Sequence, residues 1–248
     1  MLWYKAWRES RVRFLISASI ITSMCLVYVL LQARLLPGVM RETPRVHNYL
    51  QYIHWSVFGG AVRGVLQLSC LLLGLGGLQR DRKQGTLGFT LALPTSRPRL
   101  VITRAVMGFF QVLTLSILPP FILAATSPLV HQQLPLSYGL PFIPLWAIGG
   151  LFTFAVSFLC SVLFTSEYVA LAVAYMSYMF YLAGVRHPRL APYHLHVADL
   201  MSGDAPHQLD PHTTLWVGTY PIAPIFGFLA AAIFLLAIAT FITTHQDL

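Results

Sequence analysis

Long apolar stretches without Asp, Glu, Lys or Arg alternate with short charged segments along the chain. The charge-free stretches are residues 14–33, 105–166, 168–185 and 211–246. A membrane-spanning helix needs about 20 predominantly apolar residues. We therefore predict an all-α integral membrane protein with six transmembrane helices, near residues 13–32, 53–78, 99–125, 142–164, 168–185 and 221–243.

The composition agrees with this pattern. Of 248 residues, 56% are hydrophobic and 10% are charged, against about 25% charged in an ordinary soluble domain. This excludes a water-soluble globule, a disordered chain, a secreted disulfide scaffold and a free nucleic-acid-binding domain. Cys25, Cys70 and Cys160 lie singly in apolar stretches and are expected to be small buried residues. Residues 1–248 are predicted to form a single transmembrane domain.

Basic residues are distributed unevenly between the two sides of the predicted bundle. Ten Lys and Arg residues flank the spans on the side of the N-terminus, and five lie on the other side. Because cytoplasmic loops carry an excess of Lys and Arg, both termini are expected in the cytoplasm and the chain in the cell (inner) membrane. Residues 2–14 place Trp3, Trp7 and Phe14 near one face, which predicts an amphipathic helix in the headgroup plane before the first span.

The connection between the second and third spans, residues 79–104, is longer than a simple loop requires. Gly85 permits a sharp exit from the second span, and Pro94 ends the helical piece that follows. The predicted product is a short interfacial helix between two turns, suited to transmitting motion from a cytoplasmic partner. We call residues 79–99 the coupling segment; a generic amphipathic loop is the alternative.

The coupling segment resembles that of the membrane subunits (permeases) of type-2 ABC transporters, which are mostly exporters. Their connection typically reads E-R-x-x-G-T-L-E, an apolar stretch, then L-P-x-S-R; this chain has Asp81-Arg82, Gly85-Thr86-Leu87 and Leu93 to Arg97 in that order. Asp81 replaces the usual Glu, and Gly88 stands where an acid commonly follows. The resemblance implies that a separate ATP-binding subunit docks on Asp81, Arg82, Gly85, Thr86, Leu87, Phe89, Leu91, Pro94, Ser96 and Arg97, with Glu167 as a second contact between spans four and five.

The same resemblance implies partners and topology. It implies six spans with cytoplasmic termini, a homodimer or a heterodimer with a second permease, contact with membrane lipids and no nucleic acid. The sequence has no GxxxxGK[ST] phosphate loop, so this chain is not expected to be an enzyme or to hold a cofactor, and ATP and magnesium are expected on the partner. Within the extracytoplasmic segment, about residues 186–220, residues 198–203 resemble a short helix ending in glycine.

Arg63 is the one strong base in the middle of a predicted span, where a charge costs about 2.5 to 3.5 kcal/mol on the insertion scale. It shares a helical stripe with Gln67 and is either a lining residue of the substrate path or an arginine that reaches the outer headgroups. The resemblance implies that Tyr175 and Tyr178 of the fifth span contact substrate. Ordinary helix packing is the alternative for both tyrosines.

Residues 187–212 contain five histidines and three aspartates, which suggests metal binding. No HxxxH or HExxH pair accompanies them, so no metal site is expected. No nucleophile motif or intramembrane carboxylate pair indicates catalysis, so no catalytic residue is assigned. An intramembrane enzyme, a metal-handling membrane protein and a membrane scaffold without transport remain the alternatives to a permease.

Overall fold

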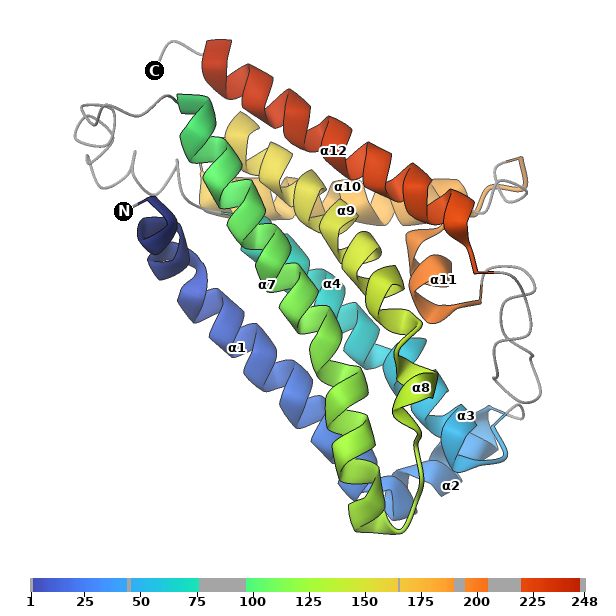
Figure 1. The fold of residues 1–248 in the computed structure, drawn as a ribbon. Helices are drawn as coiled ribbons and strands as arrows, with labels where there is room; N and C mark the ends of the chain where they lie inside the picture. The colour runs from blue at the N-terminus through green and yellow to red at the C-terminus, as the bar shows by residue number, and fades with distance from the viewer. Residues whose placement is uncertain are drawn as a thin grey trace.

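The fold is all-α in a computed structural model that describes residues 2–43, 46–75, 97–164, 166–189, 195–204 and 220–245. No β-strand occurs in these ranges (Figure 1). The longer helices are α1 (Leu2–Leu30), α2 (Gln32–Glu42), α4 (Ala61–Gly74), α7 (Arg97–Thr126), α9 (Phe142–Leu163), α10 (Glu167–Val185) and α12 (Ile222–His245). The shorter elements are α3 (Tyr49–Ile53), the π-helix η1 (His54–Phe58), the 3₁₀-helix η2 (Ser127–Val130), α8 (Leu136–Gly139) and α11 (Val197–Ser202).

Six helical stretches in the described ranges are long and apolar enough to cross a membrane. They are Leu2–Leu30, Tyr49–Gly74, Arg99–Val130, Leu136–Leu163, Glu167–Val185 and Ile222–His245. The six predicted spans are thereby confirmed, and helix length and hydropathy make the chain a multi-pass membrane protein. The start of α1 and the end of α12 lie at the same end of the bundle (Figure 1), here called the terminal end; α2, α3 and α11 lie toward the opposite end, here called the α11 end.

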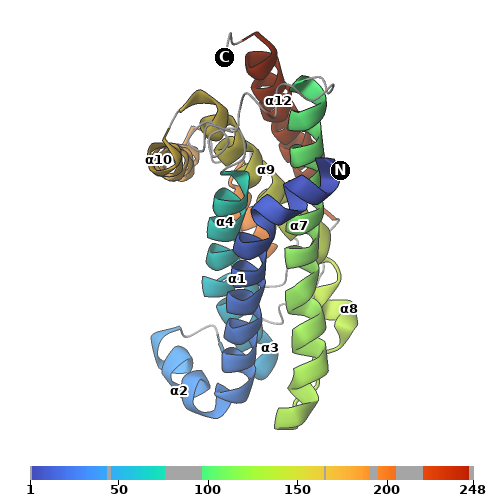
Figure 2. The ribbon, with the colours of Figure 1, turned by 90° about the vertical axis from the view of Figure 1, so that its left-hand side faces the viewer.

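The N-terminal amphipathic segment differs from the prediction. Residues 2–14 are not a separate helix, because α1 is helical without a break from Leu2 to Leu30. Its first turns are inclined to the rest of the helix (Figure 2). No proline or glycine interrupts residues 2–30, so the amphipathic part and the first span share one set of backbone hydrogen bonds.

The second span contains a π-helix directly after α3, which the apolar pattern did not predict. Residues His54–Phe58 form η1, and α4 starts at Ala61 after a bend at Gly59 and Gly60. A Cβ atom at Gly60 would lie 2.3 Å from the Trp55 carbonyl oxygen and 2.7 Å from that of Ser56. Only glycine fits there, since any side chain would collide with the backbone of η1.

Helix α9 forms the centre of the bundle and packs against α4, α7, α10, α11 and α12. Small residues let these helices approach closely, which matters because lipid tails are as apolar as the helices and provide no hydrophobic drive for association. Ser157 of α9 donates a hydrogen bond to the Leu71 carbonyl of α4 over 2.5 Å. A Cβ at Gly150 of α9 would lie 2.9 Å from the Val112 side chain and 3.0 Å from the Cys70 sulfur.

Two glycines of α4 provide a matched test of this packing. A Cβ at Gly74 would lie 2.6 Å from the Phe154 carbonyl oxygen and 2.9 Å from the Phe158 amide nitrogen, whereas a Cβ at Gly64 would meet nothing within 4 Å. We expect Gly74→Ala to destabilise the chain by about 1–3 kcal/mol and Gly64→Ala to be neutral or to stabilise it by up to about 1 kcal/mol. Thermal unfolding of both variants in one detergent checks this, and equal midpoints would contradict the α4–α9 contact.

Candidate functional site

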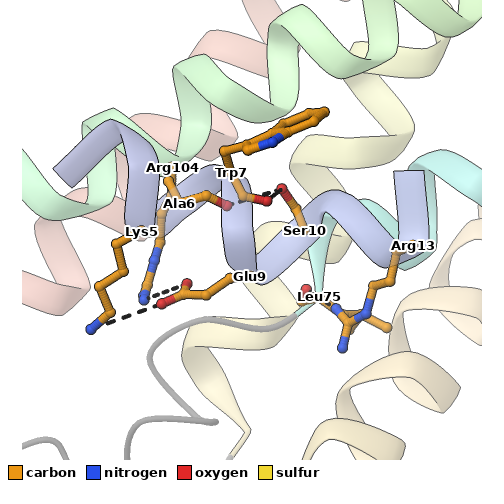
Figure 3. A network of polar contacts seen from close by, with 8 residues as sticks. All are labelled: Lys5, Ala6, Trp7, Glu9, Ser10, Arg13, Leu75 and Arg104. Atoms are coloured by element: carbon orange, nitrogen blue, oxygen red, sulfur yellow. Dashed lines mark hydrogen bonds and ion pairs between the residues drawn. The ribbon is translucent and has the colours of Figure 1, made fainter. Parts of the chain in front are cut away.

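A network of charged side chains joins four helices at the terminal end. It consists of Glu9, Ser10 and Arg13 of α1, Arg104 and Gln111 of α7, and Glu167 of α10, and we call it the α1 network (Figure 3 shows most of it). A cavity of about 40 Å³ lies among these side chains and the end of α4. The network lies where the chain leaves α4 and re-enters the bundle at α7.

Arg13 binds the end of α4 and the start of α10 together. Its guanidinium donates hydrogen bonds to the carbonyl oxygens of Leu72, over 3.3 Å, and of Leu75, and it forms an ion pair with the Glu167 carboxylate. The last carbonyls of a helix have no partner within the helix and carry partial negative charge. Arg13 thus caps α4 from a different helix while Glu167 balances its charge.

Glu9 binds the start of α7. Its carboxylate accepts a hydrogen bond from the Arg104 guanidinium over 2.9 Å and lies 3.8 Å from the Lys5 ammonium group of the same helix. The Gln111 amide, seven residues after Arg104 on α7, donates a hydrogen bond over 2.6 Å to Ser10 Oγ, the residue after Glu9 (Figure 3 shows the α1 side). Two adjacent residues of α1 therefore attach to α7 at points about two turns apart on α7.

Most of the predicted ATPase contacts lie outside the described residues, in the part of the sequence between α4 and α7. These are Asp81, Arg82, Gly85, Thr86, Leu87, Phe89, Leu91, Pro94 and Ser96. Arg97 is the first residue of α7, and Glu167 forms its ion pair within the chain, with Arg13. The structure describes the chain up to Leu75 and again from Arg97. Because α1 contacts the end of α4 and the first part of α7, it is attached to the helix on each side of the coupling segment.

Arg63 anchors α11 to α4. Its guanidinium Nη1 donates a hydrogen bond to the Ala198 carbonyl oxygen over 2.7 Å. Its Nε is buried and has no hydrogen-bond partner among the described residues. The predicted short helix is confirmed as α11, which ends at Gly203 with φ of 75°, a conformation that favours glycine.

Two further side chains attach α11 to the bundle. Gln67 Nε2 lies 3.3 Å from Met201 Sδ, and the Trp146 indole donates a hydrogen bond to the Met201 carbonyl over 2.9 Å. A Cβ at Gly149 would lie 2.5 Å from Met201 side-chain atoms, so α11 lies directly on the α9 backbone. We call the set of Arg63, Gln67, Trp146, Gly149 and Met201 the α11 cluster.

The two tyrosines predicted to contact substrate lie in different surroundings. Tyr178 is only 3% exposed and lies near Arg63, whereas Tyr175 is 44% exposed on the outer surface of α10. The structure therefore brings Arg63, Gln67 and Tyr178 together and leaves Tyr175 apart. Their sequence spacing alone could not separate the two tyrosines, because both positions fall within one turn of the helix.

Acidic groups at the α11 end balance the charge of Arg63. Asp204 follows α11, and its carboxylate lies 3.9 Å from His54 Nε2. Burial raises the pKa of Asp204, but contacts with the His54 and Ser202 side chains and the positive charge of Arg63 outweigh burial, so its pKa lies below the ordinary value. The described residues contain no group of three or more His, Cys, Asp or Glu side chains placed to hold a metal ion.

Sequence reasoning did not identify Glu9, Arg13 and Arg104 as a linked set. The available signal is that each charge lies at the edge of an apolar run, where a charge requires a partner or water.

Comparison of the sequence with models of known protein families gives no match, and comparison with curated proteins gives none.

Proposed function

We propose that the chain is the permease subunit of an ATP-driven ABC transporter of the exporter class, coupled to a separate ATP-binding subunit and working as a dimer. The observation that carries the proposal is the order of Asp81-Arg82, Gly85-Thr86-Leu87 and Leu93 to Arg97 between the second and third spans. The positive-inside bias supports cytoplasmic placement of that connection and of both termini.

The α1 network supports the proposal mechanically. A segment that receives force from a cytoplasmic ATPase requires rigid attachment of its two ends, because motion is otherwise absorbed locally. Arg13 binds the helix end before the segment and Glu9 binds the helix after it, both from α1. Displacement of the segment would therefore move α4, α7 and α1 together.

The α11 cluster is the proposed point at which such motion reaches the substrate path. Arg63 and Gln67 of α4 bind α11 at the opposite end of the helix that Arg13 caps. A shift of α4 as a rigid helix would thus alter its contacts with α11. In this proposal Arg63, Gln67 and Tyr178 line the path, and Tyr175 faces lipid or the second permease.

Co-purification tests the proposal. We expect the full chain, extracted from its native membrane in mild detergent, to carry an ATP-binding subunit with a GxxxxGK[ST] phosphate loop, with two permease chains and two ATPase subunits per complex. Phe89→Ala/Leu91→Ala should release the ATPase, since the apolar side chains of the coupling segment are expected to fill its groove. An intact permease dimer that binds no ATPase in any preparation would contradict the proposal.

A further inference from the structure

A deep apolar groove opens between α10 and α12. It has a volume of about 420 Å³ and is lined by Phe152, Tyr181, Ala223, Gly227, Phe228 and Ala231, with Leu195 at one end. Helices α10 and α12 both pack on α9, which lies between them (Figure 2), so α9 forms the floor. The volume falls in the range of small-molecule sites, about 300–1,000 Å³.

Three rings and a row of small residues give the groove its shape. The Phe152 ring of α9 lies 5.3 Å from the Tyr181 ring and 5.4 Å from the Phe228 ring, measured between centroids. Ala223, Gly227 and Ala231 follow one another at four-residue intervals on α12, and a Cβ at Gly227 would meet nothing within 4 Å. The groove is therefore hollow along the face of α12 that carries Ala223, Gly227 and Ala231.

Large apolar side chains are exposed on the two helices that form the sides of the groove. Phe180 of α10 and Phe226 of α12 are 71% and 64% exposed. Each lies within a helix that is long and apolar enough to cross a membrane. The groove extends along α12 from Ala223 to Ala231, about 12 Å at 1.5 Å per residue, and the Tyr181 hydroxyl donates a hydrogen bond to the Leu195 carbonyl at its end. A neighbouring transmembrane helix would cross the whole bilayer core of about 30 Å, so this short groove fits a lipid chain better than a helix.

Two cationic residues follow α10 along the chain. Arg186 and Arg189 directly follow α10 and are both exposed, and Arg186 is five residues, about 7.5 Å along a helix axis, from Tyr181. No acidic partner of either guanidinium occurs in the part of the chain that the structure describes. Guanidinium groups bind phosphate through paired, charge-assisted hydrogen bonds.

We propose that the groove binds one acyl chain of an anionic phospholipid and that Arg186 and Arg189 bind its net negative headgroup, which in a zwitterionic lipid is neutralised by the choline ammonium group. The inference does not rest on the proposed transport function. Burial of apolar surface holds the acyl chain in the groove, and the positive charge of the two arginines favours lipids with a negatively charged headgroup.

Native mass spectrometry of the full chain in mild detergent tests the site. The probes are phosphatidylglycerol, which is anionic, and phosphatidylcholine, which is zwitterionic, with identical acyl chains. We expect phosphatidylglycerol to bind about tenfold more tightly, and Arg186→Gln/Arg189→Gln to remove that preference. Gly227→Leu fills the groove and should weaken both lipids at least about tenfold, whereas Gly64→Leu, which also adds a leucine where no neighbour lies within 4 Å, should leave binding unchanged.

Three outcomes would overturn the proposal. Equal binding of the two lipids by the parent chain would remove the role of the arginines. Unchanged lipid binding in Gly227→Leu would remove the role of the groove. Conversion of a dimer into a monomer by Gly227→Leu, with lipid binding unchanged, would assign the groove to a second copy of the chain. Because the arginine variants alter only exposed residues, they test the site even if Gly227→Leu fails to fold.

Discussion

Replacement of Arg13 by leucine is expected to destabilise the folded chain by about 1–3 kcal/mol and to loosen the end of α4, beside the coupling segment, and the start of α10. The change leaves the Glu167 carboxylate without its cation and the Leu72 and Leu75 carbonyls without their donor. Breaking a fully buried pair costs about 3–5 kcal/mol. The expected value is lower because the Arg13 and Glu167 side chains are 29% and 33% exposed.

Arg11→Leu is the matched control, since it removes the same charge from an exposed position two residues away on α1. Thermal unfolding in detergent should give a midpoint well below the parent for Arg13→Leu and close to the parent for Arg11→Leu. The charge reversal Arg13→Glu/Glu167→Arg should recover part of the loss, because it restores the ion pair but not the cap on α4. Equal midpoints for the Arg13 and Arg11 variants would refute the role of Arg13.

The second large effect is expected at Arg63, where Arg63→Leu should release α11 without harming membrane insertion. The variant removes an insertion cost of about 2.5 to 3.5 kcal/mol, so expression should equal or exceed that of the parent. It also removes the hydrogen bond to the Ala198 carbonyl, and bonds to charged groups contribute about 1.5–3 kcal/mol. Local opening of α11 should therefore increase about tenfold or more.

Hydrogen exchange of residues 197–202 measures that opening directly. Gln67→Leu, one turn away on the same face of α4, removes only the contact with Met201 Sδ and should have a smaller effect. Arg63→Lys should be intermediate, since an ammonium group retains a donor but not the planar fork. Unchanged hydrogen exchange of residues 197–202 in Arg63→Leu would favour the interpretation that Arg63 reaches the outer headgroups. Under the proposed function, transport should fall in step with the loss of protection.

The sequence predicted the six spans well because their signal is local. A run of apolar residues between charges determines where a helix can cross a bilayer, and each predicted span overlaps an observed one. Helix α2 was not predicted, since Pro37 within residues 32–42 argues against a helix on sequence grounds. The π-helix η1 was not predicted either, because its apolar residues do not differ in pattern from an α-helix.

The polar contacts could not be predicted from the sequence, because their partners are far apart along the chain. Arg63 and Ala198 are 135 residues apart, and Arg104 and Glu9 are 95 apart. The first pairing depends on how α4 and α11 pack on α9, and the second on how α1 packs on α7. The sequence shows that Arg63 needs a partner in the membrane, but only the packing shows that the partner is a backbone carbonyl.

ATP hydrolysis by the purified complex tests the central claim, a permease driven by a separate ATPase, most directly. We predict that the full chain, co-purified and reconstituted with its ATP-binding subunit, raises the ATPase rate of that subunit, and that Phe89→Ala/Leu91→Ala abolishes the stimulation. The control Phe110→Ala/Leu68→Ala, which shortens two apolar side chains exposed on α7 and α4, should retain it. Full stimulation by Phe89→Ala/Leu91→Ala, or none by the folded parent, would contradict the account.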